Sequence, residues 1–175
     1  MKTAKGLMSE AVERHGLDGS KVMRVFFDGA CEPVNPGGVA TCGWIIYGGD
    51  DEIVADDAEF VREGDGATNN VAEYHALGRA LRWLVDNQQS LDGIGQLKIF
   101  GDSQLVCKQV DGSWKCNKDH LLKLRDRCRE LLAELRTKVE VEIRWIPREE
   151  NEAADSLSRT AYESHTGKSF PERRR

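Results

Sequence analysis

The sequence predicts an α/β fold in which helices flank one mixed, five-stranded sheet. Three strand-like segments come first, with no helical segment between them. Further segments then follow in the order helix, strand, helix, helix, strand, helix. An antiparallel meander, continued by strands that run parallel through helical crossovers, accounts for both observations. At 175 residues the chain fits a single domain with its own core.

The three opening strands are predicted by their apolar runs and by the turn residues between them. We expect strands over residues 22–27, 38–47 and 52–61. The turn at Gly48-Gly49-Asp50 separates the second from the third. Sequential strands joined by a Gly-rich turn are typical of a meander.

Helical periodicity begins after Thr68-Asn69-Asn70, which are residue types that favour helix N-caps. Apolar residues then recur at three- and four-residue spacing through Leu84, which predicts a long helix. We expect a strand at 96–100, a short helix at 102–110 and a longer helix from about Asn117 to Leu135. Residues 138–146 alternate apolar with charged side chains, as a half-buried strand does, and a helix over 149–162 closes the pattern.

Four acidic residues lie at the ends of predicted elements. Asp28 and Asp102 follow apolar strand-like runs, and Glu73 and Asp155 lie within about one turn of a helix start. A carboxylate at the end of a buried strand is costly without a positive or hydrogen-bonding partner. Ligands gather at the carboxyl ends of strands in sheets of this kind. Four carboxylates from distant segments therefore indicate a site for divalent metal ions.

Composition narrows the function classes. The five cysteines are odd in number and form no Cys-x-x-Cys pair, so neither a disulfide framework nor a zinc site is indicated. No apolar run approaches the roughly 20 residues that span a bilayer, and residues 1–15 lack the features of a secretory leader. We expect a cytoplasmic protein with no membrane partner. A net charge of −5 argues against nucleic-acid binding by bulk charge but leaves room for a local patch.

Four sequence blocks carry a resemblance to a known family. They are Asp28-Gly29-Ala30-Cys31 with Asn35-Pro36-Gly37-Gly38, Thr68-Asn69-Asn70-Val71-Ala72-Glu73, Asp102-Ser103-Gln104-Leu105-Val106, and residues 147–155. In this order they resemble the signature blocks of type 1 ribonuclease H, over residues 21–162. The resemblance implies a ribonuclease H-like fold. We expect this domain at 21–164, an N-terminal extension at 1–20 and a flexible tail at 165–175.

The resemblance implies an endonuclease that cuts the RNA strand of RNA–DNA hybrids and leaves 5′-phosphate and 3′-hydroxyl ends. Two Mg²⁺ ions would serve it, with Mn²⁺ as a possible substitute. By the family's pattern Asp28 bridges the ions, and Glu73 and Asp102 complete the site that activates water. Asp155 holds the ion that stabilises the leaving oxygen. The protein is expected to act as a monomer. Clustered carboxylates should also show raised, coupled pKa values without the ions.

Substrate contacts are implied in the same way. An RNA 2′-hydroxyl both donates and accepts hydrogen bonds, and the family reads it with the main chain near Cys31 and with side chains matching Asn35, Asn69, Glu73 and Gln104. A DNA-strand phosphate is expected near Thr68 and Asn35, and Trp114 matches an aromatic contact to the DNA sugar. Each also has a structural alternative: Asn69 as a helix cap, Cys31 and Gln104 as simple structural residues, and Trp114 as a packing residue.

Two departures from the family stand out. The segment from Asp111 to His120 is too short for the basic protrusion of many bacterial members and carries only Lys115 and Lys118 as formal cations. The catalytic-loop histidine is absent, and Arg148 stands in its loop. Arginine cannot shuttle a proton near neutral pH, so a role for Arg148 is electrostatic. An alternative is that Arg148 pairs only with Glu149 or Glu150.

Two other function classes remain open. A non-catalytic hybrid-binding module on the same fold would be free to lose a carboxylate, and all four are present. The second is a different nuclease, of the related integrase or resolvase architecture, that acts on DNA. The blocks at 68–70 and 102–104 favour RNA–DNA hybrids instead.

Overall fold

One sheet of five strands, in the order β3-β2-β1-β4-β5, forms the centre of the computed structural model, which describes residues 19–172. The strands β1 (Lys21–Glu32), β2 (Val39–Tyr47) and β3 (Ile53–Glu63) pair antiparallel. The strands β4 (Ile94–Gly101) and β5 (Glu140–Trp145) continue the sheet in parallel with β1. The predicted fold class, a meander extended by parallel strands, is confirmed.

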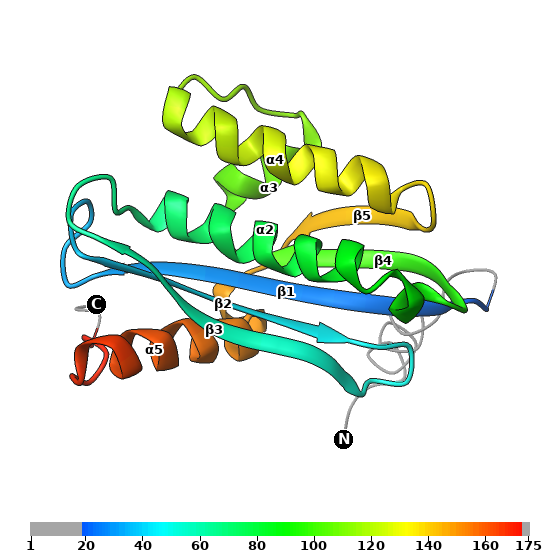
Figure 1. Cartoon of the computed structure of the whole chain (residues 1–175), viewed down its shortest axis with the longest axis horizontal. Coiled ribbons are helices and arrows are strands. Elements are labelled where there is room, and N and C mark those ends of the chain that lie inside the picture. The colour runs from blue at the N-terminus through cyan, green and yellow to red at the C-terminus, as the bar shows by residue number, and fades with distance from the viewer. Residues whose placement is uncertain (1–18, 173–175) are drawn as a thin grey trace.

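Helices cover both faces of the sheet unequally (Figure 1). The long helix α2 (Asn69–Asp86) lies on one face, and α4 (Asp119–Leu135) lies over α2 as an outer layer, with α3 (Gln104–Asp111) beside it. The helix α5 (Glu152–Thr166) lies on the opposite face. Two short 3-10 helices, η1 (Gln88–Leu91) and η2 (Arg148–Glu150), complete the described elements. One face thus has two helical layers and the other has one.

The main core lies between the sheet and α2, and continues between α2 and α4. Phe27, Leu77, Leu81, Leu97 and Leu132 are all fully buried there. The apolar spacing that predicted the two long helices also supplies this core, because residues three and four apart share one helix face. The packing of these side chains fixes the edge of the sheet at which the acidic residues lie.

Side-chain caps fix the starts of two helices beside that edge. The Thr68 hydroxyl accepts a hydrogen bond from the Val71 N–H (3.1 Å) at the start of α2. The Ser103 hydroxyl accepts one from the Val106 N–H (3.2 Å) at the start of α3. Such caps satisfy amide groups that the helix itself leaves without partners. These caps therefore fix the start of α2 near Glu73 and the start of α3 next to Asp102.

Several predicted boundaries differ from the observed ones. The first strand was expected to end before Asp28, but β1 continues to Glu32 because β2 pairs with it as far as Val39. The predicted alternation of the last strand would bury Trp145, yet its side chain is 44% exposed. The cause is that β5 is an edge strand, and its end is instead tied by a hydrogen bond from the indole N–H to the Asp102 carbonyl oxygen (3.1 Å). The 3-10 helix η1 was not predicted.

The C-terminal boundary also lies later than expected. The helix α5 continues to Thr166, past the predicted domain end at 164, and stops at Gly167, whose φ of +67° suits glycine. After α5 the chain returns toward this helix, since Phe170 packs against Tyr162. Residues 1–18, most of the predicted extension, and residues 173–175 lie outside the described residues. Within the described part of the chain, none of the helices has the length and apolar character needed to cross a membrane.

Candidate active site

The parallel pairing of β1 with β4 places two carboxylates side by side. The last pair in this register is Phe27 with Gly101, so Asp28 and Asp102 come next along the two strands. Beyond this point β4 ends while β1 continues along β2. The two aspartates therefore lie where the sheet opens, as the sequence predicted for the carboxyl ends of these strands.

A close approach of α2 to β1 brings Glu73 to the same place. A Cβ added at Gly29 would lie 2.3 Å from the Glu73 backbone nitrogen and 2.4 Å from the Ala72 carbonyl carbon. Only glycine at this position lets the helix come so near the strand. As a result, one carboxylate oxygen from each of Asp28, Glu73 and Asp102 lies within 4.8 Å of the others.

Burial and mutual repulsion raise the pKa values of these three carboxyls. Burial raises the pKa of Asp28 to about 7, and the charges of Asp102 and Asp155 add to this. Burial raises the pKa of Glu73 well above its ordinary value, followed by the charges of Asp28 and Asp102. Burial also raises the pKa of Asp102, against the opposing effects of the Asn151 amide and the Arg148 guanidinium. The cluster resists carrying three negative charges without a compensating cation.

The donor set fits a hard divalent cation. Glu73 is 6% exposed, and its Oε2 is buried with no hydrogen-bond partner. Buried carboxylate oxygens without partners are rare and costly. Three carboxylates offer only oxygen ligands, which Mg²⁺ and Mn²⁺ prefer, and no thiol or imidazole belongs to the cluster. A divalent cation at this point would satisfy the Glu73 oxygen and relieve the repulsion.

The fourth predicted carboxylate, Asp155, approaches from the other face of the sheet. A Cβ at Gly43 of β2 would lie 2.5 Å from the Ser158 nitrogen and 2.6 Å from the Ala154 carbonyl oxygen, so glycine also lets α5 lie close to the sheet. The Ser158 hydroxyl donates a hydrogen bond to Asp28 Oδ2 (3.1 Å), which ties α5 to the cluster.

Asp155 itself is engaged by two guanidinium groups. Arg148 donates from Nη2 to Oδ1 at 2.8 Å, and Arg159 donates from Nε to Oδ2 at 2.8 Å. Asp155 is near enough for its charge to act on Asp28, but its oxygens do not belong to the cluster that Asp28, Glu73 and Asp102 form. The alternative that Arg148 pairs only with Glu149 or Glu150 is not what the structure shows.

A groove of about 470 Å³ opens over the cluster. Its lining includes Asp28, Glu73 and Asp102 together with four more of the predicted site residues: Cys31, Asn35, Asn69 and Arg148. The Asn69 backbone N–H donates to Asn35 Oδ1 (3.2 Å), which joins the loop after β1 to the start of α2. Cys31 is buried and its thiol donates to the Val34 carbonyl oxygen (3.3 Å), so its side chain is occupied structurally.

Three predicted substrate contacts lie outside this lining. Thr68 caps α2 and borders a second hollow, which Arg62, His120 and Lys123 also line. Gln104 is exposed at the first turn of α3. Trp114 is 45% exposed in the segment between α3 and α4.

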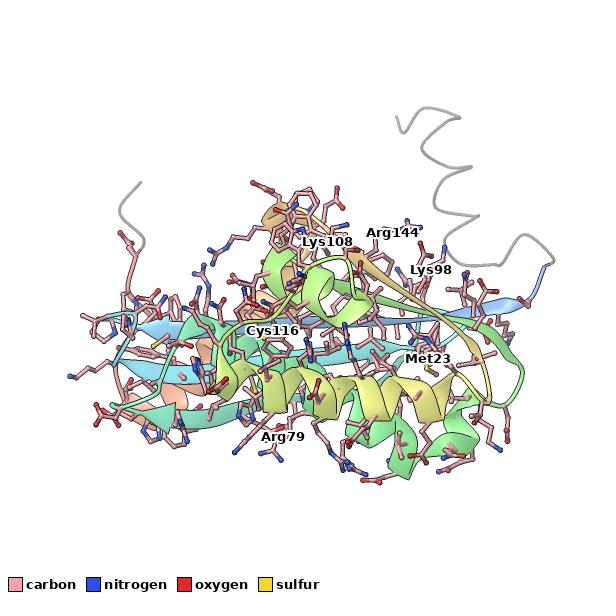
Figure 2. All side chains as sticks on the ribbon, turned by 90° about the horizontal axis from the view of Figure 1, so that it is seen from above. Met23, Arg79, Lys98, Lys108, Cys116 and Arg144 are labelled. Carbon is pink, nitrogen blue, oxygen red and sulfur yellow. The ribbon has the colours of Figure 1, made fainter. Side chains whose placement is uncertain are left out.

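The connecting segment is anchored by Cys116, labelled in Figure 2, whose side chain is buried in the main core.

Sequence reasoning missed three residues that shape the site. Asn151 is 1% exposed and donates to the Phe27 carbonyl oxygen (3.0 Å), which fixes the backbone just before Asp28. Ser158 and Arg159 lie three and four residues after Asp155, the spacing that places side chains on one face of a helix. This spacing could have identified both residues as neighbours of Asp155.

Comparison with known proteins decides the family. The model of the reverse transcriptase-like family matches residues 26–161, a span that contains all four carboxylates. The chain belongs to this family. Over 139 residues this reverse transcriptase-like chain is 40% identical to ribonuclease HI of Halobacterium salinarum, covering 79% of the chain and 63% of that protein. It is 34% identical to the bifunctional protein Rv2228c of Mycobacterium tuberculosis and spans 33% of its length. The chain therefore spans only part of these curated relatives.

Solved structures show the same fold for the reverse transcriptase-like chain. The crystal structure of RNase H1 from Halobacterium salinarum matches with a TM-score of 0.68 and 37% identity, covering 82% of this chain and 98% of that one. LC11-RNase H1 in complex with an RNA/DNA hybrid matches with a TM-score of 0.67 and 26% identity, covering 82% and 98%. The resemblance to ribonuclease H that the four sequence blocks predicted is thus confirmed for family and fold.

Proposed function

We propose that this chain is a metal-dependent endoribonuclease that hydrolyses the RNA strand of RNA–DNA hybrids with two Mg²⁺ ions, leaving 5′-phosphate and 3′-hydroxyl ends. Mn²⁺ is proposed as a substitute. The observation that carries the proposal is the cluster of Asp28, Glu73 and Asp102, with its buried, unpartnered Glu73 oxygen, at the floor of a groove. The ribonuclease HI relative and the hybrid-bound neighbour support the substrate class.

Asp28, Glu73 and Asp102 would hold the cations, and Asp155 would join them from α5. When bound, divalent cations supply an activated water and stabilise the negative charge of phosphodiester hydrolysis. Asp28 must lose the proton that burial favours before it serves as a ligand. The Ser158 hydroxyl then keeps Asp28 oriented through its hydrogen bond to Oδ2.

Arg148 lines the groove beside the cluster and is proposed to hold the scissile phosphate. A guanidinium has fixed, planar donors and stays charged at neutral pH, so it binds a phosphate but does not accept a proton. Its pairing with Asp155 keeps this guanidinium at the groove in the absence of substrate.

Selection of RNA is proposed to come from polar groups along the groove. Asn35 and Asn69 both line it, and the hydrogen bond from the Asn69 backbone N–H to Asn35 Oδ1 orients the Asn35 side chain for a 2′-hydroxyl. Gln104 and the main chain near Cys31 are proposed to add contacts to the same strand.

The DNA strand is proposed to lie toward Thr68. Arg62 and Lys123 line the second hollow there and outnumber its one carboxylate, Asp119, which suits a phosphate backbone even though the whole chain is acidic. Trp114 has the exposure that stacking against a sugar or base requires. The expected monomeric state and cytoplasmic location stay predictions.

Cleavage of strand-labelled substrates tests the function. An RNA–DNA hybrid, a DNA duplex and single-stranded RNA are incubated with Mg²⁺, Mn²⁺ or EDTA, and Asp28→Asn is compared with Asp56→Asn, an exposed aspartate on β3. We expect metal-dependent cutting of the RNA strand of the hybrid, lost in Asp28→Asn and kept in Asp56→Asn. Removal of the terminal phosphate with a phosphatase should identify the 5′ ends. Binding of the hybrid without cutting would favour a binding module, and cutting of the DNA duplex would favour a DNA nuclease.

A further inference from the structure

Asp155 differs from the other three carboxylates in how its oxygens are used. Oδ1 accepts from Arg148 and Oδ2 accepts from Arg159, each at 2.8 Å. Asp28 accepts from the Ser158 hydroxyl, and Glu73 has one oxygen without any partner. A cation that binds Asp155 must therefore displace or share an arginine, whereas a cation that binds the other three meets no such competitor among the contacts described.

Arg159 is itself held by the segment that follows α5. Its guanidinium carbon lies 4.9 Å from the centroid of the Phe170 ring, a cation–π arrangement. Phe170 is fixed in turn by an edge-to-face contact with Tyr162 (5.3 Å between centroids) and by a hydrogen bond from its N–H to Glu163 Oε1 (3.0 Å). The chain after α5 thus folds back and fixes the side chain that occupies Asp155.

The arginines also interact electrostatically with a second carboxylate. Burial raises the pKa of Glu32, which lines the groove, and the charges of Arg148 and Arg159 act against this rise. An arginine that leaves Asp155 would therefore keep a favourable interaction with a second carboxylate. This reduces the electrostatic cost of the exchange.

We propose that Arg159 and Phe170 are positioning residues that set the cation affinity of the site, because Arg159 competes with the cation for Asp155 and Phe170 keeps Arg159 in place. The inference rests on the proposed metal site. It assigns a role in that site to the segment after α5, which lies outside the four sequence blocks.

Calorimetric titration of the metal-free protein with Mn²⁺ measures this directly, without substrate. We expect Arg159→Ala to bind Mn²⁺ about two- to five-fold more tightly than wild type, since a half-exposed arginine–carboxylate pair contributes only a modest free energy. Phe170→Ala should shift the affinity in the same direction by a smaller factor. Phe60→Ala is the matched control, because Phe60 stacks on His165 at the same end of α5 (3.9 Å between centroids) and has no described contact with Arg159.

A second comparison separates competition for Asp155 from a general charge effect. In an Asp155→Asn background, Arg159→Ala should leave Mn²⁺ affinity unchanged, because the carboxylate for which Arg159 and the cation compete is gone. An equal gain in affinity in both backgrounds would overturn the proposal, and so would unchanged affinity in Arg159→Ala alone. A change in Arg159→Ala with none in Phe170→Ala would overturn the part played by Phe170. Circular dichroism confirms that each variant is folded, and a wild type that binds no Mn²⁺ would instead refute the proposed metal site.

Discussion

Asp28→Asn should stabilise the metal-free protein at alkaline pH. Burial and the neighbouring carboxylates raise the pKa of Asp28 from 3.8 to about 7, and one pKa unit corresponds to about 1.4 kcal/mol. The ionised side chain therefore lowers the free energy of unfolding by up to about 4 kcal/mol. Asparagine has nearly the same shape and carries no charge, so it removes this penalty.

The sign of the pH dependence follows from the direction of the shift. The folded state binds the Asp28 proton more tightly than the unfolded state does. The stability linked to that proton is fully present below the unfolded pKa, near 3.8, and is lost as the pH rises through the folded pKa, near 7. Wild type and Asp28→Asn should thus differ little near pH 4 and most at pH 8.

Urea denaturation in EDTA, followed by circular dichroism at pH 4, 6 and 8, tests this reasoning. At pH 8 the gain in the free energy of unfolding should be up to about 4 kcal/mol, which in a thermal melt corresponds to a rise in Tm of roughly 8–16 °C for a domain of this size. Asp56→Asn, on the exposed part of β3, should follow wild type at every pH. If Asp28→Asn were no more stable than wild type at pH 8, burial of repelling charges at this site would be refuted.

Three further predictions follow from the same region. Gly29→Ala should lower the free energy of unfolding by about 1–3 kcal/mol and weaken Mn²⁺ binding, because its Cβ would lie 2.3 Å from the Glu73 nitrogen. Urea denaturation and calorimetric titration measure the two effects. Gly78→Ala is the control, because the added Cβ there meets only the Cys128 sulfur, at 3.7 Å. Saturating Mg²⁺ at pH 8 should raise the Tm of wild type and leave that of Asp28→Asn nearly unchanged in a thermal melt, since only the intact cluster gains from the ion. Arg148→Ala should lower kcat for hybrid cleavage about tenfold or more while some activity remains, and complete loss of turnover with normal Mn²⁺ affinity would contradict an auxiliary role.

The sequence was sufficient for the order of elements and for the rim that gathers the carboxylates. Apolar periodicity and cap residues reflect local physics, and the parallel pairing that aligns Asp28 with Asp102 follows from topology. The partners of Asp155 could not be assigned in this way. The pairing of Arg148 depends on how η2 is placed against α5, and the contact of Arg159 with Phe170 depends on a return of the chain after Gly167.

The position of β5 at the edge of the sheet explains why the predicted burial of Trp145 was wrong. The alternating pattern of residues 138–146 correctly predicted a strand, but periodicity does not say whether a strand has neighbours on both sides. Trp145 is exposed because β5 is the last strand of the sheet.

The unequal covering of the sheet has a consequence for the order in which the site comes apart. Glu73 belongs to α2, which is enclosed between the sheet and α4, whereas Asp155 belongs to α5, which has no second helix over it (Figure 1). Local opening is easiest where an element has least buried contact. Local opening of α5 would therefore withdraw Asp155 and release the Ser158 hydrogen bond to Asp28, while Glu73 stays held in the enclosed helix α2.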